Sequence, residues 1–177
     1  MKKTIIILTL ICFSSCKFAE KESYILPEGF IGNTMIFTNI KSGEEKEYDD
    51  NGRRLYLIST SGILLSRFRE TYGVIDKRFF YGTKDKINSE IKGVNFQDNI
   101  DLLDTGKVYA FYGNDETVTF PDSKDTLGVQ VITICKPKDL DFFKKDLFVK
   151  RILDMHFLPA ELSYKRLLEL KKNPEGP

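Results

Sequence analysis

Short apolar segments recur between residues 34 and 135, separated by polar stretches that contain glycine, asparagine or aspartate. Short segments rich in β-branched and aromatic residues are typical of β-strands. The predicted strands are residues 34–40, 53–58, 63–65, 78–81, 107–112, 116–120 and 129–135. Residues 82–106 give only weak signals. This pattern predicts a mainly β, antiparallel, sandwich-like domain over residues 24–136.

Two turn signals suggest how these strands pair. Asp50-Asn51-Gly52 precedes residues 53–58, so we expect that strand to return along residues 34–40 as a hairpin. Gly113-Asn114-Asp115 lies between residues 107–112 and 116–120 and predicts a second hairpin.

The apolar spacing becomes helical after Pro137. Residues 139–154 have apolar positions three to four residues apart, which predicts one helix. Pro159 stands where a second helix, ending at Leu170, would begin. We expect residues 137–173 to form a two-helix unit packed on the β domain.

The first residues have the order of a secretory signal peptide, which we assign to residues 1–15. Lys2 and Lys3 precede an apolar run over residues 4–13, and small residues follow it. As a helix this run would reach about 15 Å, half of a hydrocarbon core of roughly 30 Å. The run is therefore too short to span a membrane.

Residues 13–16 read Phe-Ser-Ser-Cys and resemble the lipobox of bacterial lipoproteins, although phenylalanine stands where leucine is usual. The resemblance implies that the mature chain starts at Cys16 with acyl chains attached, and that residues 16–23 form a tether. Each buried methylene contributes about 0.8 kcal/mol, so two or more chains anchor a protein stably. We therefore expect lipid anchoring in the bacterial cell envelope, at the outer membrane. A secreted protein cut near the same place is the alternative.

The stretch from Tyr24 to Gly32 follows the pattern Y-x-L-P-x-G-F-x-G. This start is similar to that of an uncharacterised domain family found in bacterial lipoproteins. Residues 56–64 and 79–81 look like its continuation. The family has no assigned activity, so the resemblance implies no functional residue.

Charge and cysteine content exclude several functions. The chain has 27 Lys and Arg against 26 Asp and Glu, which argues against a nucleic-acid partner or a polybasic membrane patch. Of three cysteines, Cys12 leaves with the leader and Cys16 takes the lipid, so Cys135 has no disulfide partner. One histidine and one cysteine do not make a zinc site.

The candidate reactive residues favour structural roles. His156 lies near the predicted end of the first helix without a metal-ligand or catalytic spacing, and Cys135 ends an apolar strand. Residues 47–52 partly imitate a calcium loop, but Ile58 stands where a bidentate glutamate belongs, so a hairpin turn fits better. Further acidic residues lie in polar, turn-like sequence and are interpreted as surface: Asp98, Asp101, Asp104, Asp115 and Glu116.

These observations predict a non-enzymatic envelope lipoprotein, without cofactor or metal, that binds a protein partner or supports an assembly. A toxin-neutralising immunity protein is one version. The alternative is a small-ligand or carbohydrate binder that uses surface tyrosines such as Tyr56, Tyr72 or Tyr81. An enzyme that uses His156 comes third.

The lipidation hypothesis is tested by Cys16→Ser. We expect the variant to remain unacylated and to leave the membrane fraction, because a near-neutral domain has no electrostatic membrane affinity to replace the lipid. Cell fractionation with metabolic palmitate labelling measures both properties. A variant that still sediments with membranes like the wild type would contradict the assignment.

Overall fold

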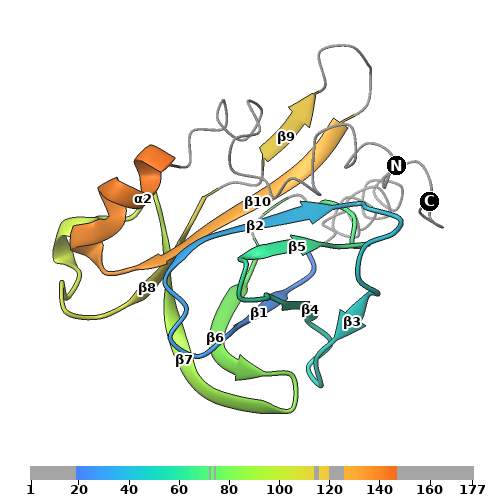
Figure 1. The fold of residues 1–177 in the computed structure, drawn as a ribbon, viewed down its shortest axis with the longest axis horizontal. Helices are drawn as coiled ribbons and strands as arrows, with labels where there is room; N and C mark the ends of the chain where they lie inside the picture. The colour runs from blue at the N-terminus through green and yellow to red at the C-terminus, as the bar shows by residue number, and fades with distance from the viewer. Residues whose placement is uncertain (1–18, 72, 74, 114–115, 120–125, 147–177) are drawn as a thin grey trace, which may run out of the picture.

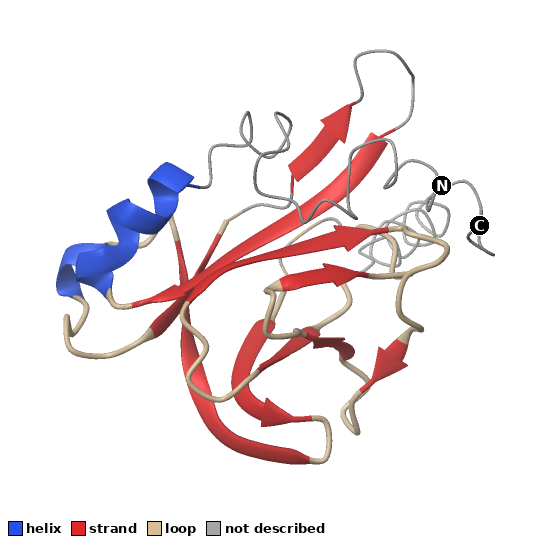
Figure 2. Ribbon diagram, in the orientation of Figure 1, coloured by secondary structure: helices blue, strands red, loops and turns tan. Residues whose placement is uncertain are grey.

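A computed structural model describes residues 19–71, 73, 75–113, 116–119 and 126–146 of the chain. The described strands form one sheet, shown in Figures 1 and 2. The strands are β1 (Glu22–Leu26), β2 (Gly32–Thr38), β3 (Glu47–Tyr48), β4 (Arg54–Leu57), β5 (Ile63–Leu65), β6 (Lys77–Thr83), β7 (Lys86–Asn95), β8 (Tyr109–Tyr112), β9 (Glu116–Thr119) and β10 (Thr126–Cys135). The helical elements are η1 (Ile100–Leu102), η2 (Pro137–Asp139) and α2 (Leu140–Asp146).

The sheet has the strand order β3-β4-β1-β6-β7-β8-β10-β2-β5, and β9 pairs with β10. It curls into a half-barrel, so that its two ends, β3–β4 and β5, come near each other (Figure 1). Residue Glu44, in the loop between β2 and β3, forms a parallel bridge with Ser66 just after β5. The loop thereby connects the two ends of the sheet.

The predicted mainly β composition is confirmed, but the antiparallel sandwich is wrong. One curled sheet replaces two facing sheets, and four strand pairs are parallel: β1–β4, β1–β6, β2–β5 and β7–β8. Turn residues reveal only pairing between neighbouring segments, whereas parallel partners are joined by long connections without a turn signal. The sequence pattern therefore could not show the parallel pairs.

Both predicted hairpins pair differently in the structure. β4 returns along the short strand β3, and β2 pairs with β10 and β5 instead. β9 pairs with β10, and β8 lies between β7 and β10. Most of β7 lies in residues 82–106, for which the sequence pattern predicts no strand. Its first five residues are all exposed, so apolar and polar positions do not alternate there.

The inner face of the half-barrel is filled by a row of aromatic rings. Tyr24 on β1 lies opposite Tyr56 on β4 and Phe79 on β6 in the strand register. Its ring stacks on theirs with centroid distances of 4.9 and 5.0 Å. All three are fully buried. Cross-strand aromatic pairs of this kind each contribute about 0.5–1.5 kcal/mol beyond their buried area.

The opposite face of β7, β8 and β10 is covered by α2. Phe111 and Cys135 on this face form a buried cluster with Leu140 of the helix. The predicted helix over residues 139–154 is thus described only as α2, preceded by η2 with Pro137 in its first turn. The predicted second helix, residues 159–170, lies outside the described residues. No helix within the described ranges is long and apolar enough to cross a membrane.

Two glycines with positive φ provide a matched test of the fold. Gly62 (φ 74°) closes the turn before β5, and a Cβ there would lie 2.6 Å from the carbonyl oxygen of Asn33. Gly52 (φ 71°) has open space around it. We expect Gly52→Ala to lose about 1–2 kcal/mol of unfolding free energy from the left-handed backbone alone.

Gly62→Ala adds a backbone clash and should lose at least about twice as much. Urea unfolding of both variants measures the difference. Equal losses would contradict the close approach of β2 to the turn before β5.

Candidate functional site

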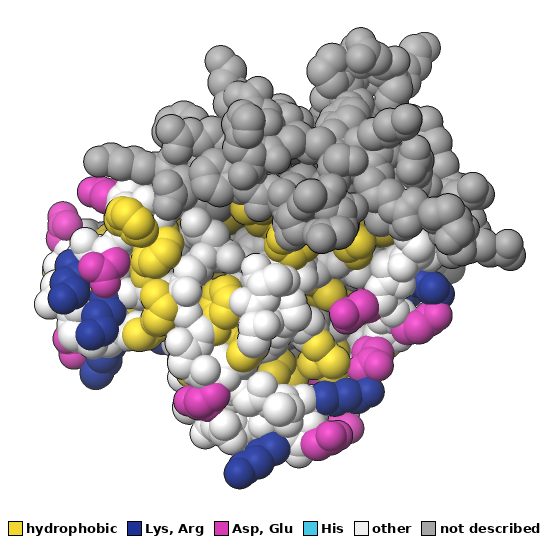
Figure 3. All heavy atoms as spheres, in the orientation of Figure 1, with side chains coloured by type: hydrophobic (Ala, Val, Ile, Leu, Met, Phe, Trp, Pro, Cys, Tyr) yellow, Lys and Arg dark blue, Asp and Glu magenta, His cyan; other side chains and the backbone are white. Residues whose placement is uncertain are grey.

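Two open hollows meet at Glu44 on the outside of the half-barrel, where the loop after β2 passes between β4 and β5. One, of about 320 Å³, lies against β5 and the turn before it. The other, of about 280 Å³, lies against β3 and β4. We call the two together the seam groove. Figure 3 shows hydrophobic side chains in the middle of the face that it presents, with charged side chains toward its left and lower right margins.

The floor of the seam groove is apolar because of strand alternation. On β4, Arg54 and Tyr56 point to the inner face, so Leu55 and Leu57 lie on the outer one. On β5, Ile63 and Leu65 also lie on the outer face, and Leu64 between them is buried. Leu57, Ile63 and Leu65 are half-buried, so their side chains remain partly open to solvent.

Three glutamates form an acidic rim along the groove: Glu44, Glu45 and Glu47. The Arg67 guanidinium donates to Glu45, and Lys84 pairs with Glu47 at 2.7 Å. Burial raises the pKa of the Glu44 carboxyl above its ordinary value, and the neighbouring charge of Glu47 raises it further. Glu44 therefore lies partly desolvated and beside Glu47, at the point where the two hollows meet.

The edge strand β5 is covered by its own chain. The Ser61 Oγ accepts a hydrogen bond from the Ile63 amide at 3.2 Å, and the Ser59 hydroxyl donates to the Ile63 carbonyl at 3.4 Å. The Glu44 amide donates to the carbonyl of Leu65 at 2.8 Å. These bonds occupy backbone groups that an added strand would need, as natural edge strands often do.

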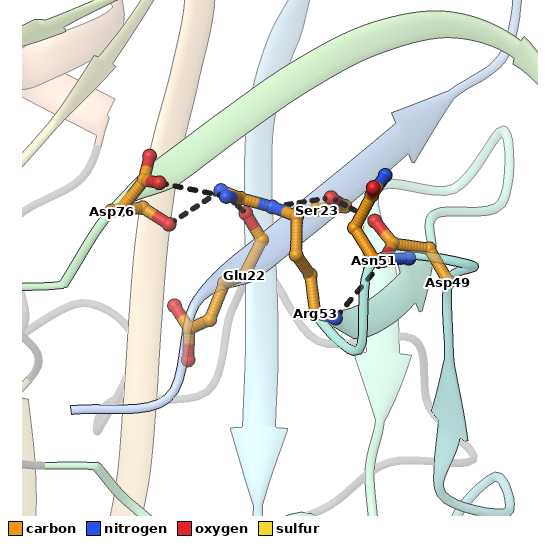
Figure 4. Close-up of polar contacts among 6 residues, drawn as sticks. All are labelled: Glu22, Ser23, Asp49, Asn51, Arg53 and Asp76. Atoms are coloured by element: carbon orange, nitrogen blue, oxygen red, sulfur yellow. Dashed lines mark hydrogen bonds and ion pairs between the residues drawn. The ribbon is translucent and has the colours of Figure 1, made fainter. Parts of the chain in front are cut away.

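Arg53, which directly precedes β4, is the centre of a polar network in which its own side chain is buried (Figure 4). Its Nε donates to Ser23 Oγ at 3.0 Å, and Nη1 donates to Asp76 Oδ2 at 2.7 Å. Nη2 donates to the carbonyls of Glu22 at 2.8 Å and Asp76 at 2.6 Å. One guanidinium thus joins the starts of β1, β4 and β6.

Asp49 supports this network from the turn between β3 and β4. Its Oδ1 accepts from the amides of Asn51 and Arg53, both at 2.9 Å, and its Oδ2 accepts from Ser23 Oγ at 2.8 Å. Burial raises the pKa of Asp49, but these hydrogen bonds and the charge of Arg53 outweigh it and hold the pKa below its ordinary value. The turn is therefore fixed by protein donors, which confirms a hairpin turn at residues 47–52.

A charged row lies at the same end of the inner face. Arg54, Glu22 and Lys77 are register partners on β4, β1 and β6. Glu22 is fully buried; it accepts hydrogen bonds from the hydroxyls of Tyr24 and Tyr56, and Lys77 Nζ lies 3.9 Å away. A buried carboxylate needs such partners, so the row compensates the cost of burying the charge.

β1 begins at Glu22, two residues before the Tyr24 at which we expected the β domain to open. Sequence reasoning did not find Glu22, Arg53 or Asp76, because their partners are far apart in the chain. The only local signal was the spacing of Asp49 and Arg53 around the Asn-Gly turn.

Cys135 is buried, as expected. Burial raises the pKa of its thiol to about 11, and Asp139 adds to the shift. The thiol therefore stays protonated at neutral pH and packs as a small apolar group.

The tyrosines proposed for ligand binding are placed differently. Tyr56 is buried in the aromatic row, so its assignment to the surface is wrong. Tyr81 is half-buried, and its hydroxyl donates to the carbonyl of Phe30 at 2.8 Å. Tyr72 lies outside the described residues, as do Cys16 and His156.

The acidic residues between β7 and β8 lie at the surface in turns, where backbone amides donate to Asp98 and Asp104. Asp115 is outside the described residues. Within the part of the chain that is described, no group of three or more His, Cys, Asp or Glu side chains could hold a metal ion.

Comparison with known proteins assigns the chain to a family. A model described as "Family of unknown function (DUF6843)" matches residues 19–132, more than half of the chain. The chain belongs to this family, which confirms the predicted membership of an uncharacterised one. No curated protein matches the chain. A crystal structure described as "Putative Lipoprotein from Bacillus anthracis" is similar at 10% identity and a TM-score of 0.47, covering 78% of this chain and 98% of that one.

The Arg53 network predicts that Asp76→Asn lowers the free energy of unfolding by an amount that depends on pH. The hydrogen bond from Arg53 holds the pKa of Asp76 below its unfolded value, so its stabilisation is full above that value and is lost as pH falls through the folded pKa. Because Asp76 is half exposed, solvent screening limits the effect, and we expect the free energy of unfolding to fall by about 1–2 kcal/mol at pH 7.

The loss should be smaller at pH 3 than at pH 7, and it should approach zero only below the folded pKa of Asp76. Urea unfolding at both pH values measures it, with Asp50→Asn, an exposed neighbour in the β3–β4 turn, as the control. A loss that is equal at both pH values would exclude the ion pair as its cause.

Proposed function

We propose that this chain is a lipid-anchored protein of the bacterial cell envelope, and that it binds another protein through the seam groove without catalysing a reaction. The location rests on the signal-peptide pattern and the lipobox-like residues ending at Cys16. The binding function rests on the groove.

The observation that carries the binding function is the contrast between the two faces of the sheet. The inner face is closed by stacked rings and a compensated charged row. The outer face carries an open hollow with half-buried leucine and isoleucine side chains. Partly exposed apolar side chains in a groove with a polar rim are typical of protein interaction sites.

The described candidates for catalysis support a binding role rather than a reaction. Glu22 is fully buried beneath its tyrosine partners, and the raised pKa of Cys135 keeps its thiol neutral. A nucleophile or general base has to reach its substrate, so these positions favour structure. Burial of Tyr56 also removes one of the rings on which a carbohydrate-binding surface would depend.

Site-specific photocrosslinking in intact cells tests the binding function. A benzophenone amino acid in place of Leu57, which lines the groove, should give discrete adducts with an envelope protein after irradiation of the full-length protein. The matched control is the same substitution of Leu102, an exposed leucine in η1.

Identical adducts at both positions, or no adduct from position 57, would contradict a groove-bound protein partner. An adduct that adds less than the mass of a protein would support the small-ligand alternative instead.

A further inference from the structure

The seam groove brings one carboxylate without a cationic partner next to an apolar floor. Among the described residues, Glu45 pairs with Arg67 and Glu47 pairs with Lys84, whereas Glu44 has no such partner. Glu44 lines both hollows, so a group bound at its carboxylate would lie within reach of both.

We propose that the seam groove binds an extended segment of a partner protein in which lysine or arginine residues alternate with leucine-like residues. This inference rests on the proposed function and names the chemistry of its partner. The basic side chain pairs with Glu44, and its apolar neighbours occupy the hollows on either side.

The size of the hollows fits side chains of a short segment. A volume of about 320 Å³ is at the lower end of ligand pockets, which run from about 300 to 1,000 Å³. Residues of an extended chain alternate between two sides. A segment that lies across the groove can therefore present alternate apolar side chains to Leu57 and Ile63, and the long basic side chain between them reaches back to the exposed carboxylate of Glu44.

The covered edge of β5 limits how a partner segment can bind in the groove. Ser59, Ser61 and the Glu44 amide already bond both backbone groups of Ile63 and the carbonyl of Leu65. A partner strand would have to displace these bonds, so side chains and not strand addition give the affinity. Charge complementarity is then the main source of specificity.

The same acidic rim argues against a second copy of this chain as the occupant. A two-fold dimer through the groove would place Glu44 of each copy near the acidic rim of the other. Like charges at such short range are unfavourable.

Fluorescence anisotropy with three labelled peptides tests the proposal on the purified mature protein. The probes are an alternating lysine–leucine hexapeptide, an alternating glutamate–leucine hexapeptide and an alternating lysine–serine hexapeptide. Only the first should bind, and its affinity should fall as salt is raised.

Two matched pairs of variants locate the binding. Glu44→Gln should weaken the lysine–leucine peptide about tenfold, whereas Glu90→Gln, an exposed glutamate on β7, should not. Leu57→Ser should weaken it by a similar factor, and Leu102→Ser should have no effect. Glu44 and Glu90 are both exposed, so circular dichroism should show both glutamate variants folded.

Glu44→Lys provides the sharpest readout, because it should reverse the preference toward the glutamate–leucine peptide. Equal binding of all three peptides, or no effect of Glu44→Gln, would overturn the proposed partner chemistry. Concentration-dependent dimers that Leu57→Ser abolishes would assign the groove to self-association. Adducts from position 57 in cells, with no peptide preference, would leave the protein-binding function intact and reject only the basic–apolar partner.

Discussion

The fold depends on how the guanidinium of Arg53 joins three strands that no short turn connects. β1, β4 and β6 are parallel neighbours, and the segments between them contain other strands of the sheet. Arg53 donates to Ser23, to the carbonyl of Glu22 and to Asp76, which fixes where each strand starts relative to the others. A shift of one residue would turn the aromatic row outward, so this register decides which side chains fill the core.

The arrangement of the two faces follows from that register. With the strand starts aligned, the charged row and the aromatic row lie in successive layers across the inner face, centred on Glu22 and Tyr24. The residues that alternate with these rows face outward, and Leu55 and Leu57 on β4 are among them. The groove on the outside is therefore a consequence of the same alternation that closes the inside.

Part of this architecture could be predicted from the sequence. Residues 63–65 and 129–135 were found as strands because their apolar pattern is local, and the mainly β composition followed from many such segments. Burial of Cys135 followed from its place in the last of these strands. The antiparallel sandwich was wrong because pairing between distant parallel strands leaves no local signal.

The candidate site was harder to predict for a related reason. Glu44 looks like any surface glutamate in a polar loop, and Leu57 looks like a core residue of a strand. Only the curl of the sheet, which brings the loop after β2 between β4 and β5, places them together. Tyr56 shows the converse, since its sequence context suggested an exposed ring and the register buries it.

The central claim is that the interior serves only as packing and that binding occurs at the seam groove. The most direct measurement is amide chemical-shift mapping by NMR of the mature protein during titration with the lysine–leucine peptide. We predict that shifts concentrate at Glu44, Leu57 and Ile63, with little change at Tyr24 and Phe79. Shifts concentrated at the aromatic row, with none along the groove, would contradict the account.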